Sequence, residues 1–414
     1  MSDKKPLLQT LKGFRDFLPE EKKRRDFVMD SIKKTFETFG FEPLETPTLE
    51  YSSLILGKYG TEADKLVYSF KDRGNRQIAL KYDQTVPTAR VLAQYKDQLP
   101  KYFRRYQIQN VFRADKPQKG RYREFTQCDI DIFNTTSPIA DAEIIACTYF
   151  VFKNLGFPNI ILKINDRQIL FNILKPYSTK TISVLSIIQT IDKLDKKPKP
   201  EVIKELINKG LPQKSANQAL NNIQKAKITK NLKSIYNYSI NLGVPKKNLQ
   251  FSPSLARGLD YYTGMIFEVI IPEYPIGSFG GGGRYDKLIS QLGGPDIPAV
   301  GIAYGFDRMV EAATKLNLIK STKSNKNVLV TQFPGYEEKS LNTACKLRKQ
   351  NINTEVYPQS EDLAKQLKYA NKKNIPFVII IGPDEANKNL VTLKNLETRQ
   401  QETISIEKVI EKLK

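Results

Sequence analysis

The chain has 414 residues, 66 lysines and arginines against 44 acidic residues, a formal net charge of +22, and no histidine. The missing histidine excludes Ser-His-Asp and Cys-His catalysis and any zinc site with a histidine ligand, so chemistry must rest on carboxylates, Arg, Lys, Tyr or bound metal. The length predicts about two to four domains, and the charge favours a polyanionic partner such as nucleic acid, unless it reflects only a Lys-rich composition.

The N-terminal half alternates helical and strand patterns. Residues 20–39 carry apolar residues at helical spacing, and Gly40 follows as a helix C-cap. The Pro-bearing segment 40–51 is typical of a sheet edge or an interface. Short strands are predicted at 65–70, 76–83, 102–115 and 122–133, with helices at 85–96 and, opened by Ser-Pro, at 137–156.

The rest of the chain changes character twice. Residues 175–248 are helical in period and Lys-rich, which indicates an inserted helical module. Strand character returns at 265–271, at the glycine run near 280–283, and at 299–316, where a strand turns into a helix through Gly305. Polar residues 319–327 predict a linker, and the alternating strands and helices of 328–414 predict a small parallel-type α/β domain.

The cellular compartment is indicated by features that the sequence lacks. Its three cysteines, Cys128, Cys147 and Cys345, are too few and too scattered for a disulfide framework. No apolar run approaches the ~18 residues of a membrane span, and the N-terminus has no signal-peptide pattern. We therefore expect a soluble cytoplasmic protein that does not enter a membrane.

Several residues are chemically suggestive but ambiguous alone. The glycine run lacks phosphate-loop spacing and fits either a tight turn or a close backbone approach. In the hairpin 113–131 the alternation puts Phe125, Gln127, Asp129 and Asp131 on one face, which fits either a polar pocket or a hydrated sheet face. Asp83 and Thr85 stand at a strand–helix junction, where either a ligand or a helix cap explains them. Arg308 opposes a helix dipole and hints at an anionic ligand.

A family resemblance runs in order from about residue 12 to residue 414. RGLDYYTG (257–264) and GGGGRYD (280–286) resemble the two signature motifs of histidyl-tRNA synthetases, supported by KYDQT (81–85) and FTQCDID (125–131). The segments 111–133 and 301–310 look like motifs 2 and 3 of class II synthetases, and 40–51 is similar to motif 1.

The resemblance implies a fold and a domain plan. We expect an α+β catalytic domain built on an antiparallel sheet, formed by residues 1–174 and 249–318, with a helical insertion at 175–248. A linker at 319–327 then leads to a C-terminal α/β anticodon-binding domain at 328–414. The resemblance further implies histidine–tRNA ligase activity, with ATP as substrate, Mg²⁺ bound with ATP rather than at a dedicated protein metal site, and L-histidine and tRNA(His) as partners. The motif 1 segment and the family imply a homodimer.

The resemblance also implies roles at matching positions. The histidine substrate would be held by a set of residues that surround its ammonium, carboxylate and imidazole groups: Asp83, Thr85, Arg113, Gln127, Asp131, Arg257, Tyr261 and Tyr262. A cationic amine binds favourably to carboxylates, and an imidazole binds favourably to hydrogen-bonding groups in a pocket lined by aromatic rings. ATP would be bound by Arg113, Asp115, Arg121, Phe125 and Arg308, with Phe125 stacking on adenine and Arg308 at the γ-phosphate.

Two arginines would be catalytic. Arg113 would bridge the substrate carboxylate and the α-phosphate, and Arg257 would neutralise the α-phosphate during in-line attack. Positioning and charge stabilisation carry such a step without a protein base. Gln118, in the motif 2 loop, is expected to read the extra 5′ guanosine of the tRNA. Asp115 and Asp131 stand where many relatives have Glu, and their reach is one methylene shorter.

Two alternatives remain open: a synthetase-like sensor that binds histidine or tRNA without aminoacylation, and a different class II synthetase, which RGLDYYTG disfavours. The absence of histidine has a candidate cause, since an enzyme that supplies histidine to translation escapes dependence on it by containing none. Engineering and genome bias are the competing explanations.

Overall fold

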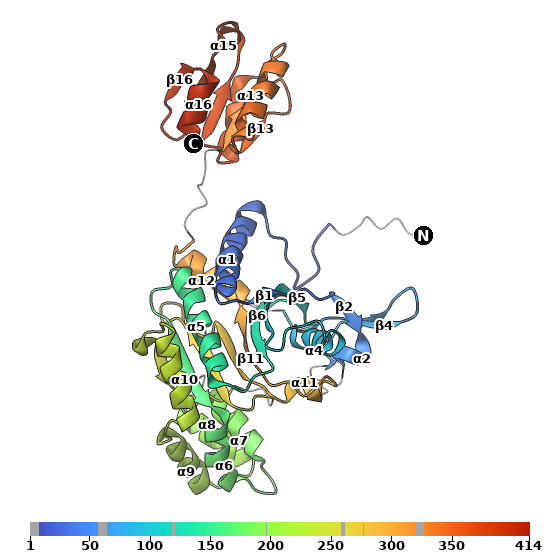
Figure 1. Cartoon of the computed structure of the whole chain (residues 1–414), viewed down its shortest axis with the longest axis vertical. Coiled ribbons are helices and arrows are strands. Elements are labelled where there is room, and N and C mark those ends of the chain that lie inside the picture. The colour runs from blue at the N-terminus through green and yellow to red at the C-terminus, as the bar shows by residue number, and fades with distance from the viewer. Residues whose placement is uncertain are drawn as a thin grey trace. The chain divides into compact units, whose positions relative to one another are not determined.

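The computed structural model describes residues 8–56, 64–117, 121–195, 197–257, 261–275, 277–319 and 327–414. The chain divides into two compact units, Met1–Ile319 and Lys320–Lys414 (Figure 1). Within the described residues, no helix combines the length and apolar character that a membrane crossing requires. The predicted boundaries of the domains, the helical insertion and the linker stay predictions.

An eight-stranded sheet forms the centre of the first unit. Its strands lie in the order β1-β5-β6-β11-β10-β9-β7-β8 and are antiparallel except at the two edge pairs, β1 with β5 and β7 with β8. In that order the strands span Glu42–Pro43, Arg104–Phe112, Glu124–Phe133, Ala299–Gly305, Gly280–Arg284, Met265–Ile270, Ile161–Asp166 and Leu249–Phe251. The predicted antiparallel catalytic sheet is confirmed, and the proline-bearing β1 lies at its edge as expected.

One face of this sheet is covered by helices. They are α1 (Pro19–Thr38), α5 (Pro138–Asn154), α10 (Lys230–Asn241) and α12 (Phe306–Lys315), and α5 and α10 run side by side (Figure 1). Ser137 caps α5 by accepting from the Ile139 amide, and Gly40 ends α1 at φ 71°, as the sequence predicts. The apolar face of β6 packs into this helical layer through Cys128, Ile130 and Ile132.

The alternate residues of β6 point to the opposite face of the sheet, because successive strand side chains alternate. Gln127, Asp129 and Asp131 are buried there together with Arg105 and Gln107 of β5. Burying carboxylates and a guanidinium is costly unless they are paired or hydrogen-bonded. The polar face therefore marks where the site must be sought.

Beside it lies a small sheet in the order β2-β4-β3, with strands Leu49–Tyr51, Gln77–Leu80 and Ser69–Lys71. The short helix α2 (Ser52–Ile55) and helix α4 (Thr85–Gln94) flank it. One face of this sheet exposes apolar side chains, with Tyr51 60% and Phe70 47% exposed.

The helical region follows β7. It contains α6 (Arg167–Leu174), α7 (Val184–Ile191), α8 (Lys199–Asn208) and α9 (Gln213–Gln224), with 3₁₀ turns η1 (Lys175–Tyr177), η2 (Asp192–Asp195) and η3 (Lys246–Asn248). Helix α6 packs on α7 and α9, whereas α10 packs on α5. A short helix, α11 (Leu288–Gln291), follows β10.

The second unit is a five-stranded sheet in the order β13-β12-β14-β15-β16. The strands, in chain order, are Val328–Val330, Thr354–Val356, Phe377–Ile380, Val391–Asn395 and Gln401–Ile404. The helices are α13 (Glu337–Lys349), α14 (Leu363–Lys372), α15 (Pro383–Asn387) and α16 (Ile406–Leu413). The α/β class is confirmed. The sheet is mixed, however, because β15 and β16 form an antiparallel hairpin that the sequence analysis did not predict.

Candidate active site

A pocket of about 400 Å³ opens on the polar face of the large sheet. It is lined by the β5–β6 hairpin, by β10 and its preceding turn, and by the junction of β11 with α12. Six residues predicted from the sequence line it: Arg113, Asp115, Arg121, Phe125, Arg257 and Arg308. The structure thus brings together all five predicted ATP-binding residues and both predicted catalytic arginines.

The hairpin side of the pocket is built around two arginines. Arg113 lies between two rings, with Cζ 4.4 Å from the centroid of Tyr82 and 5.2 Å from that of Phe125, and its Nε donates to the Tyr82 carbonyl over 3.1 Å. Arg121 makes a two-pronged pair with Asp115, over 3.0 and 2.9 Å. Gln118, the predicted tRNA contact, lies outside the described residues.

The opposite end of the pocket is the first turn of α12. Arg308 donates from Nη1 to the Ser278 carbonyl, which leads into β10. Its neighbour Asp307 accepts from Arg15 and Arg25, two residues of the N-terminal segment that the sequence analysis did not connect to the site. An acidic residue in the first turn of a helix is favourable, and it offsets the unfavourable position of Arg308.

Arg257 lies on the glycine run. An ideal Cβ at Gly281 would stand 2.0 Å from the Arg257 Cζ and 2.1 Å from its Nη1. Arg257 also has φ 50°, a left-handed conformation that is rare for a side-chain-bearing residue and is found where the surroundings enforce it. Its nearest described carboxylate is Glu268, with Nη1 to Oε2 at 3.7 Å.

The glycine run is a regular strand rather than a turn. Strand β10 pairs antiparallel with β9 on one side and β11 on the other. A Cβ at Gly282 would meet the Gly301 carbonyl at 2.1 Å, and one at Gly283 would meet the Met265 carbonyl at 2.4 Å. Of the two interpretations left open by the sequence, close backbone approach is correct.

Deeper on the same face, two carboxylates share one buried cation. Asp131 pairs with Arg105 over 2.7 Å and accepts from the Tyr285 hydroxyl, while Asp129 lies 3.9 Å from Arg105. Burial raises the pKa of Asp131 and raises that of Asp129 well above its usual range, and Arg105 opposes both shifts. Two carboxyl groups therefore face one guanidinium, and a further cation beside them would favour the ionised form of both.

Gln127 belongs to this cluster. Its Nε2 donates to Asp129 over 2.9 Å, so its Oε1 is left as an acceptor, and that buried Oε1 has no partner within the described part of the chain. A buried unpaired acceptor costs free energy. Both features of the cluster, the second carboxyl group against a single guanidinium and the free acceptor, are complementary to an ammonium or imidazolium group.

The junction between β4 and α4 lies beside the carboxylate cluster. Asp83, one position before the N-cap residue Gln84, accepts from the Thr85 and Val86 amides over 3.0 and 3.2 Å, so its side chain satisfies the first amides of α4, as the helix-cap interpretation of the sequence holds. Its charge adds to the effect of burial on the pKa of Asp131, which places Asp83 beside the cluster as well.

The two tyrosines of RGLDYYTG differ in position. Burial raises the pKa of Tyr261 well above its usual range, the charge of Asp83 adds to that shift, and the charge of Arg257 opposes it. Its ring lies 6.0 Å from that of Tyr285. Tyr262 is buried in an apolar core against Gly283, and Tyr261 packs on the edge of the same core with its ring 4.6 Å from that of Tyr262.

Sequence reasoning missed Arg105, Tyr285 and Asp307. Arg105 is opposite Asp131 in the β5–β6 register, so an inward cation facing an inward acid was the available signal. Tyr285 lies two residues after the glycine run, and its contact with Asp131 could be found only from the strand order β6-β11-β10. Nothing in the sequence pattern links Arg15 or Arg25 to Asp307.

The antiparallel sheet with an arginine-lined pocket on one face, together with a separate C-terminal α/β unit, defines a class II aminoacyl-tRNA synthetase. Residues 13–309 match the family model for histidyl-tRNA synthetase, and residues 327–414 match an anticodon binding domain. The chain belongs to the histidyl-tRNA synthetase family.

Curated relatives agree over nearly the full length. A histidine–tRNA ligase of Gloeobacter violaceus is 38% identical, with 96% of this chain and 97% of the relative covered. One of Clostridium tetani is 37% identical, covering 98% and 97%. The crystal structure of histidyl-tRNA synthetase from Nostoc sp. PCC 7120 matches with a TM-score of 0.84 at 27% identity, covering 99% of this chain and 100% of that one. These relatives do not favour the sensor alternative.

Proposed function

We propose that the chain activates L-histidine with ATP to histidyl-adenylate and then transfers the histidine to tRNA(His). The observation that carries this proposal is the position of Arg257. Its guanidinium lies on β10 in the arginine-lined pocket and lowers the pKa of Tyr261, whose ring lies 6.0 Å from that of Tyr285, the hydroxyl donor to Asp131 in the buried cluster. A nucleotide in the pocket and an amino acid over the cluster would meet beside it.

Each side supplies what its substrate needs. Phe125 offers a ring for the adenine, and Arg308 a cation for the terminal phosphate. The cluster of Asp131, Asp129 and Gln127, together with Asp83, offers acceptors for an ammonium and an imidazole. Thr85 and the Tyr261 ring complete the amino-acid side, and Tyr262 supports it from the apolar core on the same face of the sheet.

The chemical step is attack of the histidine carboxylate on the α-phosphate, with pyrophosphate leaving. Arg113 orients the attacking carboxylate, and Arg257 offsets the charge that accumulates on the α-phosphate oxygens. Because both are fixed before the substrates arrive, by the Tyr82 carbonyl and by the glycine strand, little reorganisation is needed. No group has to remove a proton, which suits a chain without histidine.

Mg²⁺ would enter with ATP. Within the described part of the lining, the acidic residues are Asp115 and Asp307, and both pair with arginines. The described lining therefore provides no uncommitted carboxylate, so phosphate oxygens and water would supply the ligands, as Mg²⁺ commonly prefers. Bound with the nucleotide, the ion would offset phosphate charge.

The active form would be a cytoplasmic homodimer joined through the small sheet. The exposed face of β2, β4 and β3 carries Leu49, Tyr51, Phe70, Ile78 and Leu80, which lie opposite one another in the strand register. Exposed apolar patches on a folded surface mark interaction sites. The basic chain and its anticodon-type unit fit tRNA as the second partner, with Gln118 as the proposed contact to the 5′ guanosine.

Amino-acid-dependent exchange tests the proposal. The protein is incubated with ATP, labelled pyrophosphate and each amino acid in turn, and label in ATP is counted. Exchange with histidine alone is the expected result. Exchange with another amino acid would point to a different synthetase, and none at all to the sensor alternative.

A further inference from the structure

The N-terminal residues 12–17, which we call the clasp, lie against the rim of the nucleotide pocket. The Arg123 amide donates to the Gly13 carbonyl over 2.9 Å, and Arg123 Nη1 donates to the Lys12 carbonyl over 3.3 Å. Gly13 has φ 92°, and a Cβ there would stand 2.9 Å from the Arg123 side chain. The clasp is thus fitted to the start of the hairpin's returning strand.

Arg15 of the clasp touches two different walls of the pocket. Its Cζ lies 3.3 Å from the centroid of the Tyr122 ring, and its Nη2 donates to Asp307 Oδ1 over 2.9 Å. Tyr122 belongs to the hairpin and Asp307 to the first turn of α12, and both line the pocket. Arg15 is not among the described residues that line it.

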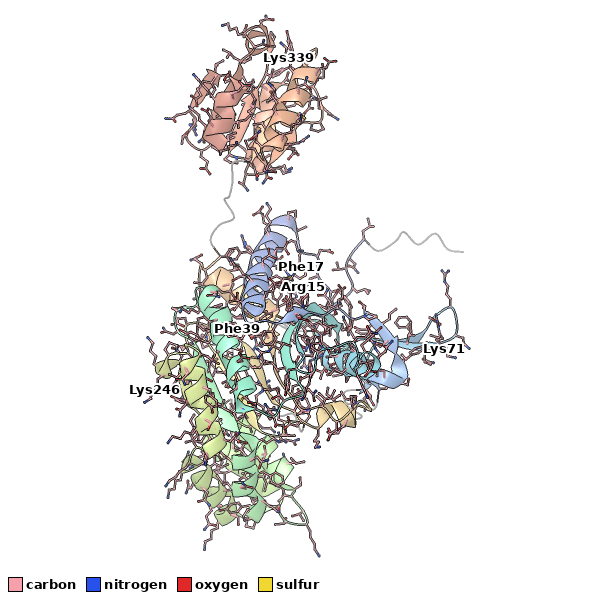
Figure 2. The ribbon with its side chains drawn as sticks, viewed as in Figure 1. Arg15, Phe17, Phe39, Lys71, Lys246 and Lys339 are labelled. Atoms are coloured by element: carbon pink, nitrogen blue, oxygen red, sulfur yellow. The ribbon has the colours of Figure 1, made fainter. Side chains whose placement is uncertain are left out.

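A second arginine reinforces the same carboxylate. Arg25 of α1 also pairs with Asp307, and its Nη2 donates over 3.1 Å to Thr126, another pocket residue. The Phe17 ring lies 4.8 Å from the Arg15 Cζ and 4.0 Å from that of Arg25, and Figure 2 marks Arg15 and Phe17 beside α1. Arg15 and Arg25 of the N-terminal segment therefore fix the start of α12, and with it the orientation of Arg308.

We propose that Arg15 is a positioning residue for ATP, which ties the hairpin to the start of α12 across the nucleotide pocket. The inference rests on the proposed function. A guanidinium suits the task because its flat face stacks on Tyr122 while its edge donates to Asp307, and an ammonium cannot do both. Without Arg15, Arg25 still joins Asp307 to Thr126, but the hairpin at Tyr122 loses its tie to α12, so Arg121 and Arg308 hold a less fixed spacing for the nucleotide.

Replacing Arg15 should weaken the binding of ATP and leave the binding of histidine almost unchanged. Arg15 is bonded to the nucleotide walls, while the carboxylate cluster is held separately by Arg105 and Tyr285. Arg15→Met should therefore raise the KM for ATP about tenfold and leave the KM for histidine within about twofold. Arg15→Lys should give an intermediate rise, because it keeps the charge but loses the stack.

The experiment is pyrophosphate exchange with each substrate varied in turn, alongside thermal unfolding. Arg24→Met is the matched control, since Arg24 lies on α1 next to Arg25 and is exposed. A cycle of Arg15→Met and Tyr122→Leu should be non-additive in the KM for ATP, which a purely structural role would not require.

Two outcomes would overturn the inference. One is an unchanged KM for ATP in Arg15→Met and Arg15→Lys, with or without a lower unfolding temperature. The other is an equal rise in both KM values, which would mean general loosening. A wild-type protein without histidine-dependent exchange would instead defeat the proposed function itself, so the two failures are distinguishable. If Arg15→Met does not fold, Arg15→Lys and the cycle built on it decide.

Discussion

The guanidinium of Arg257 occupies the space that a side chain at Gly281 would need, with its Cζ 2.0 Å from an ideal Cβ position. Gly281 sits in regular strand β10 and not in the left-handed region, so an alanine there is conformationally acceptable. The glycine is required by the arginine and not by the fold. The position of the side chain proposed to be catalytic therefore depends on the absence of a side chain in the strand below it.

Gly281→Ala should displace the Arg257 guanidinium and lower histidine-dependent exchange by about 100-fold or more, the usual cost of losing one aligned charge-stabilising group. The unfolding temperature should change little, because the clash involves the mobile end of a side chain. Gly74→Ala is the control, since its Cβ would meet only side-chain atoms at 3.3 Å or beyond. Normal exchange in Gly281→Ala would contradict the role given to Arg257.

Arg257→Ala should cost orders of magnitude in adenylate formation and affect ATP binding less, because Arg113, Arg121 and Arg308 remain in the pocket. Equilibrium dialysis of labelled ATP and pre-steady-state adenylate formation separate the two quantities. If the variant retained near-normal exchange, or lost ATP binding and exchange in equal measure, Arg257 would be a binding residue at most.

Much of the fold was predictable because local signals agreed with tertiary structure. Ser137 with Pro138 placed the start of α5, and alternation in β6 put Gln127 and Asp131 on one face. The hairpin β15–β16 was missed because nothing in the local pattern separates an antiparallel addition from a further parallel strand. Its turn closes through the Gln400 carbonyl and the Asn395 amide.

Site residues that belong to a sequence motif were predictable, whereas those brought into the site by strand pairing or distant contacts were not. Arg257, Arg113 and Arg308 belong to recognisable segments. Arg105 becomes meaningful only when the β5–β6 register sets it against Asp131. Asp307 likewise gains its two arginine partners from segments nearly 300 positions away in sequence, and no periodicity reports contacts at that separation.

Arg105→Met should destabilise the catalytic unit by about 3–5 kcal/mol, since it leaves Asp129 and Asp131 buried without their cation. It should also weaken histidine binding, because the carboxylates would respond by taking up protons. Urea unfolding and the KM for histidine measure the two effects. Arg104→Met is the control: the neighbouring Arg104 pairs with Glu143 near the surface, and such pairs contribute about 1 kcal/mol or less. Equal costs for the two variants would show that the buried cluster does not depend on Arg105.

Tyr51→Lys and Phe70→Lys should each convert the proposed dimer to monomer by placing a charge in an apolar contact, with a loss of affinity of about 100-fold or more. Light scattering coupled to size-exclusion chromatography measures the mass. Leu341→Lys, at a 54% exposed position on α13, is the matched control and should keep the wild-type mass. A dimer in all three variants would place the interface elsewhere, and a monomeric wild type would remove the dimer from the proposal.

Lys81 gives the protein a distinctive dependence on alkaline pH. Its side chain is fully buried and donates to the Thr46 carbonyl over 3.2 Å. Burial lowers its pKa from 10.5 to about 8, although the charges of Glu45 and Glu50 oppose the shift. Between about pH 8 and pH 10.5 the folded lysine is neutral while the unfolded lysine still holds its proton.

In that window the unfolded state binds more protons, so the free energy of unfolding should rise with pH, by at most about 1.4 kcal/mol per pH unit from this group. Tyr106, whose pKa is raised from 10.0 to about 12 by burial and by Glu37, should cancel the rise from about pH 10 and reverse it above about pH 10.5, because its folded form then holds the extra proton. Urea unfolding from pH 7.5 to 10 measures the slope. Lys81→Met removes the titrating group. The difference in free energy of unfolding between wild type and the variant should be constant below about pH 8 and should then grow in favour of wild type as the pH rises. Parallel curves for the two proteins across the window would mean that Lys81 keeps an ordinary pKa in the folded state.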